Sequence, residues 1–179
     1  MKMNRQIALP ILLGLLSIVV AVWLLKTPAK YINHGAAPQT HVGDPRLYPD
    51  PVLTPGAVDP VVSQDDIQST ICVAGYATSV RPPASAMRLA KQRALEAYGL
   101  NGSPREYELD HLIPLELGGC PDCQTNLWPE PYAPAPGAHE KDVAENYLHR
   151  EVCAGNMSLQ EAQRRIVSDW YRVYLEINP

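Results

Sequence analysis

The chain has 179 residues, which leaves room for one domain with attachments, and a formal net charge of −4 at pH 7. From Tyr31 onward there are 11 Lys and Arg against 19 Asp and Glu, a net charge of −8. This acidic balance argues against broad, sequence-independent binding of nucleic acid, which depends on neutralising phosphates.

The first 26 residues predict a membrane anchor or an export signal. Lys2 and Arg5 precede about 20 uncharged residues, Gln6 to Leu25, a length that spans a bilayer as a helix. Bulky residues close this hydrophobic helix and no small-residue cleavage site follows directly, which favours an uncleaved signal anchor over a cleaved signal peptide. We therefore expect a domain anchored to the inner membrane on its periplasmic side, or a secreted one if the segment is cleaved.

Residues 27–64 predict an extended, proline-rich tether. Proline fixes φ and removes a backbone donor, so a segment with recurrent prolines and no hydrophobic periodicity is a semi-rigid spacer. The folded domain is then expected at residues 65–179. The prolines of the tether are Pro28, Pro38, Pro45, Pro49, Pro51, Pro55 and Pro60.

The domain is predicted to be α+β. Residues 71–80 are expected to form short β structure broken by Gly75, and the last helix is expected to begin with a capping box of Ser158 and Glu161. Apolar residues at helical spacing predict that this last helix packs on the core. The expected helices run from Ser85 to about Tyr98 with Gly99 as the stop, from about Ala138 to Cys153, and from Ser158 to about Ile177.

The segment YELDHLIPLELGGCPDCQTNLWPEP, Tyr107–Pro131, contains the residues of greatest chemical interest. A strand is expected from Glu106 to Leu117, a wide turn at its Gly-Gly pair, and a return strand from Asn126. The helix from Ala138 would pack across this hairpin and bring all three pieces to one point. Because successive strand residues point to opposite faces, Asp110 and His111 share a site only at a strand end or bulge.

The four cysteines allow three disulfide connectivities. An exported chain reaches an oxidising compartment, which favours disulfides. The favoured pairing is Cys72–Cys153 with Cys120–Cys123. A zinc site made of Cys120, Cys123 and two histidines is the functional alternative.

Four short motifs resemble the HNH (ββα-metal) endonuclease family over about Tyr107 to Asn146: Asp110-His111, Gly118-Gly119, Asn126-Leu127 and His139. The wider layout also resembles small exported proteins of uncertain activity that bear such a core. The resemblance implies a small ββα-metal core with flanking helices. It also implies metal-dependent hydrolysis of phosphodiester bonds in nucleic acid, with DNA favoured over RNA, and no small-molecule cofactor.

Each matched position carries an implied role. His111 would be the general base, which suits an imidazole that titrates near neutral pH. Asn126 would hold the His111 loop through hydrogen bonds of its side chain. Asp110 and His139 would bind one divalent ion, Mg²⁺ first, with Mn²⁺, Ni²⁺ or Zn²⁺ as alternatives. Alternative ligands are Asp142, Glu145 or His149 on the helix, and Glu130.

Between Arg81 and Arg105 the chain is locally basic. Arg88, Lys91 and Arg105 are candidates for phosphate contacts, and the alternative is a solvated helix face. Two function classes therefore remain. One is a metal-dependent nuclease outside the cytoplasm. The other is a non-catalytic, exported, disulfide-stabilised binding or structural module with a relic HNH core.

Overall fold

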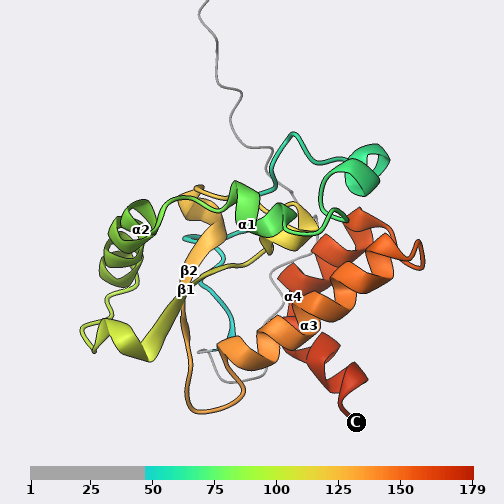
Figure 1. Ribbon diagram of the computed structural model, residues 1–179. Helices are drawn as coiled ribbons and strands as arrows, with labels where there is room; N and C mark the ends of the chain where they lie inside the picture. The colour runs from blue at the N-terminus through green and yellow to red at the C-terminus, as the bar shows by residue number, and fades with distance from the viewer. Residues whose placement is uncertain (1–46) are drawn as a thin grey trace, which may run out of the picture.

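Residues 47–179 are described by this computed structural model, and they combine several helices with one two-stranded antiparallel sheet (Figure 1). The α+β class is therefore as expected. The predicted membrane segment and the first part of the predicted tether lie outside the described residues. Among residues 47–179 no helix has the length and apolar character needed to cross a membrane.

The sheet is a hairpin of β1, Tyr107–His111, and β2, Leu127–Pro131, in which His111 pairs with Leu127. The strand predicted to reach Leu117 ends at His111. Beyond it the Ile113 amide bonds to the side chain of Asn126 instead of to a neighbouring strand, and a 3₁₀ turn follows at Leu115–Leu117. The return strand begins at Leu127, one residue after the predicted start at Asn126, which closes a 3₁₀ turn.

The three long helices are α2, Ala84–Ala97; α3, Ala138–Cys153; and α4, Leu159–Ile177. Helices α3 and α4 pack side by side, and the hairpin lies between this pair and α2 (Figure 1). Helix α2 begins at Ala84 after Pro83, so Ser85 is not its cap. Ser158 does cap α4 by accepting a hydrogen bond from the Glu161 amide, but the Glu161 carboxylate pairs with Arg164, so only half of the predicted capping box forms.

The β structure expected at residues 71–80 is wrong. The segment forms turns followed by a short helix, α1, Tyr76–Val80. Its backbone bonds are local, from the Val73 amide to the Thr70 carbonyl and from the Tyr76 amide to the Val73 carbonyl, and no strand lies alongside it in the described part of the chain. The β-branched residues here had favoured a strand, but a strand depends on a paired neighbour.

Residues 47–63 belong to the folded domain and not to a tether. Thr54 and Ala57 are fully buried. The Gly56 amide donates to the Thr125 carbonyl, and residue 58 bridges to Gly119 in the loop between the strands. Buried loop backbone needs hydrogen-bond partners, and this segment supplies them. The domain therefore begins at least as early as Leu47.

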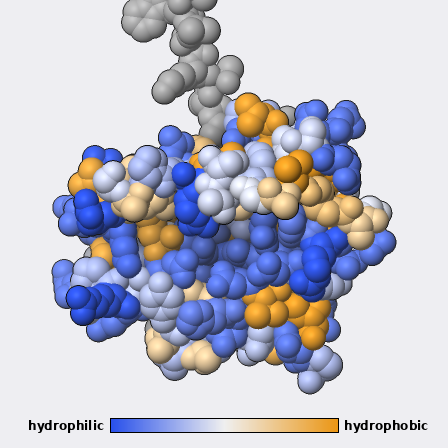
Figure 2. Space-filling view, in the orientation of Figure 1, coloured by the Kyte–Doolittle hydropathy of each residue, from blue (hydrophilic) through white to orange (hydrophobic). Residues whose placement is uncertain are grey.

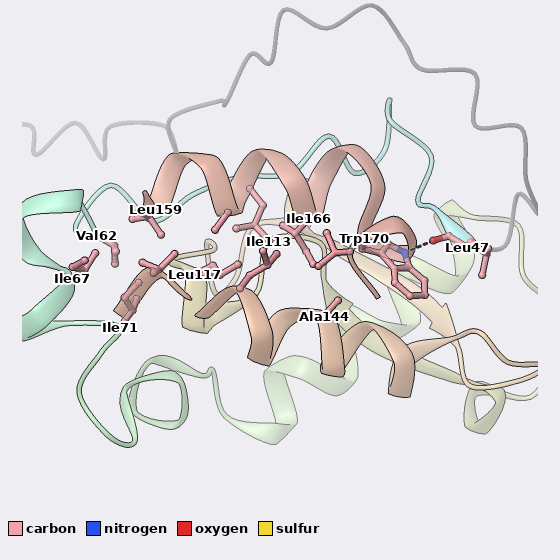
Figure 3. Packing of buried hydrophobic residues seen from close by; sticks show 14 residues of the cluster. Leu47, Val62, Ile67, Ile71, Ile113, Leu117, Ala144, Leu159, Ile166 and Trp170 are labelled. Carbon is pink, nitrogen blue, oxygen red and sulfur yellow. Dashed lines mark hydrogen bonds between the residues drawn. The ribbon is translucent and has the colours of Figure 1, made fainter. Parts of the chain in front are cut away.

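The main core lies between α3, α4 and the residues that follow β1 (Figure 3). Ile113 and Leu117 project into it from the loop after β1. Trp170 of α4 is fully buried, and its indole Nε1 donates to the Leu47 carbonyl. The backbone at Leu47 is thus held against α4. The core also fixes the loop after β1, which contributes to the candidate site.

Both predicted disulfides are confirmed. Cys72–Cys153 joins the turn before α1 to the end of α3, and Cys120–Cys123 closes a tight turn in the loop between the strands. The second bridge therefore restrains the loop between the strands, and the first ties the segment before α1 to α3. The face drawn in Figure 2 is mostly hydrophilic, with apolar groups in separate clusters.

Candidate functional site

Asn126 holds the loop that follows β1. Its side chain is fully buried and makes three close hydrogen bonds: Oδ1 accepts from the Ile113 amide at 2.9 Å, and Nδ2 donates to the carbonyls of Ile113 at 2.9 Å and Cys120 at 3.1 Å. Its backbone carbonyl accepts from the Leu112 amide. The hydrogen bonds expected of Asn126 are present, and a catalytic role remains a prediction.

Gly119 allows this loop to close. A Cβ at this position would lie 1.7 Å from the Ile113 carbonyl oxygen and 2.9 Å from Nδ2 of Asn126. Only a residue without a side chain fits here. The second glycine of the Gly-Gly pair is therefore needed for close packing of the loop on Asn126.

His111 is the last residue of β1 and is 2% exposed. Its Nε2 lies 2.9 Å from the Pro121 carbonyl oxygen. A carbonyl only accepts, so Nε2 carries the proton in the neutral ring and Nδ1 keeps the basic lone pair. Burial lowers the pKa of His111, and the positive charges of Arg81 and Lys141 add to this against the opposing effects of Pro121 and Asp110. The imidazole is thus held in its neutral, basic form.

Asp110 does not face an open metal position. Its Oδ2 lies 2.5 Å from Nζ of Lys141, a fully buried residue of α3. The same ammonium donates to the His111 carbonyl at 3.0 Å and to Glu145. We call the Asp110, Glu130 and Glu145 carboxyl groups with the His111 carbonyl the oxygen cage of Lys141.

The charges of the cage are arranged around one ion pair. Burial alone would raise the pKa of Asp110, but the charge of Lys141 and hydrogen bonds from Glu130 and Lys141 outweigh it and lower that pKa. For Lys141, burial lowers the pKa, and the attraction of Asp110 and Glu145 outweighs it and raises the value well above normal. The centre of the cage is therefore an ionised lysine–aspartate pair.

Glu130 and Glu145 behave differently. Burial raises the pKa of each carboxyl well above its usual range, and the negative charge of Asp110 adds to this while Lys141 opposes it. Glu130 is 1% exposed; within residues 47–179 its ionised form has no hydrogen-bond donor, whereas its neutral form donates a hydrogen bond to the Asp110 carboxylate. Both glutamates of the cage are thus shifted toward the neutral acid.

The pair predicted to bind a metal, Asp110 and His139, does not fit a divalent ion in this arrangement. The ammonium of Lys141 occupies the space beside the Asp110 carboxylate. His139 is exposed on the first turn of α3, with its ring centroid 5.5 Å from that of Tyr132. Among the alternative ligands, Asp142 is exposed, whereas Glu145 and Glu130 belong to the cage.

Cysteine, histidine and aspartate side chains do come close enough to hold a metal ion at two places in the described chain: Cys72 with His149 and Cys153, and Cys120 with Asp122 and Cys123. In both groups the two sulfurs form a disulfide, whereas metal binding needs thiolates. His149, an alternative ligand in the sequence, instead lies 2.8 Å from the Ile71 carbonyl oxygen. The Cys120–Cys123 group contains no histidine, which disfavours the predicted zinc site.

The three candidate phosphate contacts differ in environment. The Lys91 ammonium donates a hydrogen bond to the Tyr107 carbonyl oxygen, 2.6 Å away, and so stabilises the start of β1. Arg88 and Arg105 are exposed. Sequence reasoning missed Lys141 altogether; the signal that could have found it is its spacing of four residues from Glu145 on the inward face of α3.

A separate groove of about 920 Å³ lies at the Tyr107–Pro131 end of the hairpin. Asp110, His111 and Lys141 do not line it. Its walls are mostly aromatic rings and prolines, and Trp128, whose buried indole Nε1 has no hydrogen-bond partner in the described part of the chain, contributes to them. The aromatic residues of the groove are Tyr48, Tyr98, Tyr107, Trp128 and Tyr132.

Comparison with known proteins identifies no relative: no family model, no curated protein and no solved structure matches this chain.

Proposed function

We propose that this domain hydrolyses phosphodiester bonds of nucleic acid, DNA in preference to RNA, outside the cytoplasm. The observation that carries the proposal is the state of His111. Its Nε2 is bound to the Pro121 carbonyl, and its loop is locked by Asn126. A general base needs a neutral ring with one nitrogen free to accept a proton, and this arrangement provides it.

In this proposal Nδ1 of His111 accepts a proton from a water molecule as the water oxygen attacks phosphorus. The bond from phosphorus to the leaving oxygen breaks, that oxygen takes up a proton from a solvent water, and the His111 imidazolium then returns its proton to solvent. The lowered pKa of His111 keeps the ring unprotonated before the attack. Asn126 acts as a positioning residue, because its hydrogen bonds fix the backbone that follows His111 and do not reach the substrate.

A single divalent ion, with Mg²⁺ first, is part of what the HNH resemblance implies. Such an ion stabilises the charge of the phosphate and of the leaving oxygen. The proposal assigns it no step, because the Asp110 carboxylate is bound to Lys141 and His139 lies apart on the surface. The disulfides support the extracytoplasmic location, since such bonds persist in oxidising compartments; anchoring through residues 1–26 belongs to the proposal as well.

A second candidate function is favoured by one observation. His111 is 2% exposed, which suits a buried structural histidine in a non-catalytic binding module. The acidic balance of the chain agrees with this alternative, and the aromatic groove would then be its binding surface. The two functions predict opposite results for removal of His111.

The test is cleavage of plasmid DNA, single-stranded DNA and RNA by the full chain with its disulfides formed, with Mg²⁺, Mn²⁺, Zn²⁺ or EDTA. His149→Ala is a matched control for His111→Ala, because each histidine bonds one backbone carbonyl through Nε2. We expect cleavage by the wild type, a loss of about 10²-fold or more in His111→Ala, and retained activity in His149→Ala.

Failure to cleave any substrate under any metal condition would support the binding module. Equal activity of His111→Ala and the wild type would remove His111 from the mechanism. The thermal midpoints of both variants separate loss of chemistry from loss of folding.

A further inference from the structure

We propose that the oxygen cage of Lys141 is a built cation site whose resident cation is the lysine ammonium, and that a hard divalent cation takes this place when residue 141 is made neutral. The inference holds whether or not the domain hydrolyses nucleic acid. It assigns the buried cation position to a residue of the chain itself, where the HNH resemblance implies a metal.

The cage is assembled from three elements. Strand β1 supplies the Asp110 carboxylate at 2.5 Å and the His111 carbonyl at 3.0 Å from Nζ. Helix α3 supplies Lys141 and, one turn later, Glu145, which binds the same ammonium. Strand β2 supplies Glu130, opposite Glu108 in the ladder. Elements far apart in sequence thus converge on one buried positive charge.

Glu130 brings a third carboxyl group to the cage. It is 1% exposed, and in its ionised form neither oxygen has a hydrogen-bond donor among the described residues. As the neutral acid it donates a hydrogen bond to the Asp110 carboxylate. A hydrogen bond to Asp110 and the charges of Lys141 and Glu145 both act on it, so its oxygens lie beside the ion pair. The cage therefore contains more ligand atoms than one ammonium uses.

The ligand chemistry suits a hard cation. Carboxylate and carbonyl oxygens are the ligands that Mg²⁺, Mn²⁺ and Ca²⁺ prefer, at distances of about 2.0–2.6 Å. The Asp110 carboxylate oxygen lies 2.5 Å and the His111 carbonyl oxygen 3.0 Å from Nζ of Lys141. Small inward shifts of these oxygens would therefore bring them to metal-ligand distances. Methionine in place of Lys141 keeps an unbranched apolar side chain along the same path. It leaves the space of the ammonium group empty.

Two consequences distinguish this site from an ordinary metal site. In the wild type the ammonium excludes a divalent cation, so no binding depends on Asp110. In Lys141→Met the Asp110 charge is buried without a partner, which destabilises the fold until a cation enters. Metal addition should therefore stabilise the variant and leave the wild type unchanged.

The experiment measures Mn²⁺ binding by electron paramagnetic resonance, together with the thermal midpoint, on the full chain with disulfides formed. Five proteins are compared: wild type, Asp110→Asn, Lys141→Met, Lys141→Met with Asp110→Asn, and Lys91→Met. Lys91 is the matched control, because its ammonium binds a backbone carbonyl outside the cage. We expect Lys141→Met to bind one Mn²⁺ at least about tenfold more tightly than the wild type, and the added Asp110→Asn to abolish this gain.

Three results would overturn the inference. The first is Mn²⁺ binding by the wild type that Asp110→Asn removes, which would show that a metal displaces Lys141. The second is a folded Lys141→Met that binds no more Mn²⁺ than Lys91→Met. The third applies if Lys141→Met does not fold without metal: it is failure of this variant to fold when Mn²⁺ is added. Folding of Lys141→Met with Mn²⁺, together with no folding of the double variant under the same conditions, would support the cage.

Discussion

Replacement of Asn126 by alanine should remove the restraint on the loop that carries His111. The change leaves four buried backbone groups without this partner: the Ile113 amide, the Ile113 carbonyl and the Cys120 carbonyl, which form the shorter bonds, and the Ala57 amide at 3.4 Å. The site has no surface access, because Asn126 is fully buried. Water therefore replaces the lost bonds only if the loop opens.

The expected loss follows from the three groups that form the shorter bonds. A buried polar group left unsatisfied costs about 1–3 kcal/mol. Taking the lower part of that range for each gives a loss of about 3–5 kcal/mol in the free energy of unfolding. Since small domains are stable by only about 5–15 kcal/mol, Asn126→Ala should remove a large share of the stability.

Urea unfolding of the oxidised protein measures this loss through the midpoint and the slope. The control is Asn146→Ala, an exposed residue on α3 whose side chain makes one local bond to the Asp142 carbonyl; it should change stability by no more than about 0.5 kcal/mol. A loss below about 1 kcal/mol in Asn126→Ala at unchanged slope would contradict the reasoning, since the loop would then not depend on these hydrogen bonds.

Two further predictions concern the same loop and the cage. Because the folded-state pKa of Glu130 is raised, the native protein holds this proton more tightly than the unfolded chain, and stability falls as pH rises above the unfolded pKa. The glutamine of Glu130→Gln cannot titrate, so the free energy of unfolding of this variant relative to the wild type should increase between about pH 5 and about pH 8. The increase is at most about 1.4 kcal/mol per pH unit, and a difference between the two free energies that is constant with pH would refute this prediction. Gly119→Ala should cost more than about 3 kcal/mol, because its Cβ meets the Ile113 carbonyl. Gly75→Ala, with φ of 83° but open space around it, should cost only about 1–2 kcal/mol; equal urea midpoints for the two glycine variants would show that the loop relaxes around the methyl group.

The features that the sequence predicted correctly are those with a strong local or pairwise signal. Helix α4 has an apolar stripe and a capping serine, α3 ends before a glycine, and the four cysteines pair as expected in an exported chain. The start of the return strand was predicted to within one residue, and the hydrogen bonds of Asn126 were implied by the HNH resemblance. These signals depend on residues that are close in sequence or, for the disulfides, on a choice among only three possible pairings.

The features that the sequence did not predict depend on distant partners. Residues 47–63 look like a proline-rich spacer until the loop at Gly119 is there to accept their backbone hydrogen bonds. Lys141 looks like a surface lysine on a polar helix until β1 and β2 bring Asp110 and Glu130 to it. A charge pattern along one element cannot reveal that its partner is a strand 31 residues away.

The position of Lys141 also limits how the proposed hydrolysis can occur. The ammonium is fully buried and surrounded by oxygens of Asp110, Glu145 and the His111 backbone, so it cannot contact a phosphate in this arrangement. Arg81 is exposed, and its charge acts on His111 and on Asp142 at the start of α3. In the proposed function Arg81 is thus the surface cation whose charge reaches His111, while Lys141 balances Asp110 in the interior.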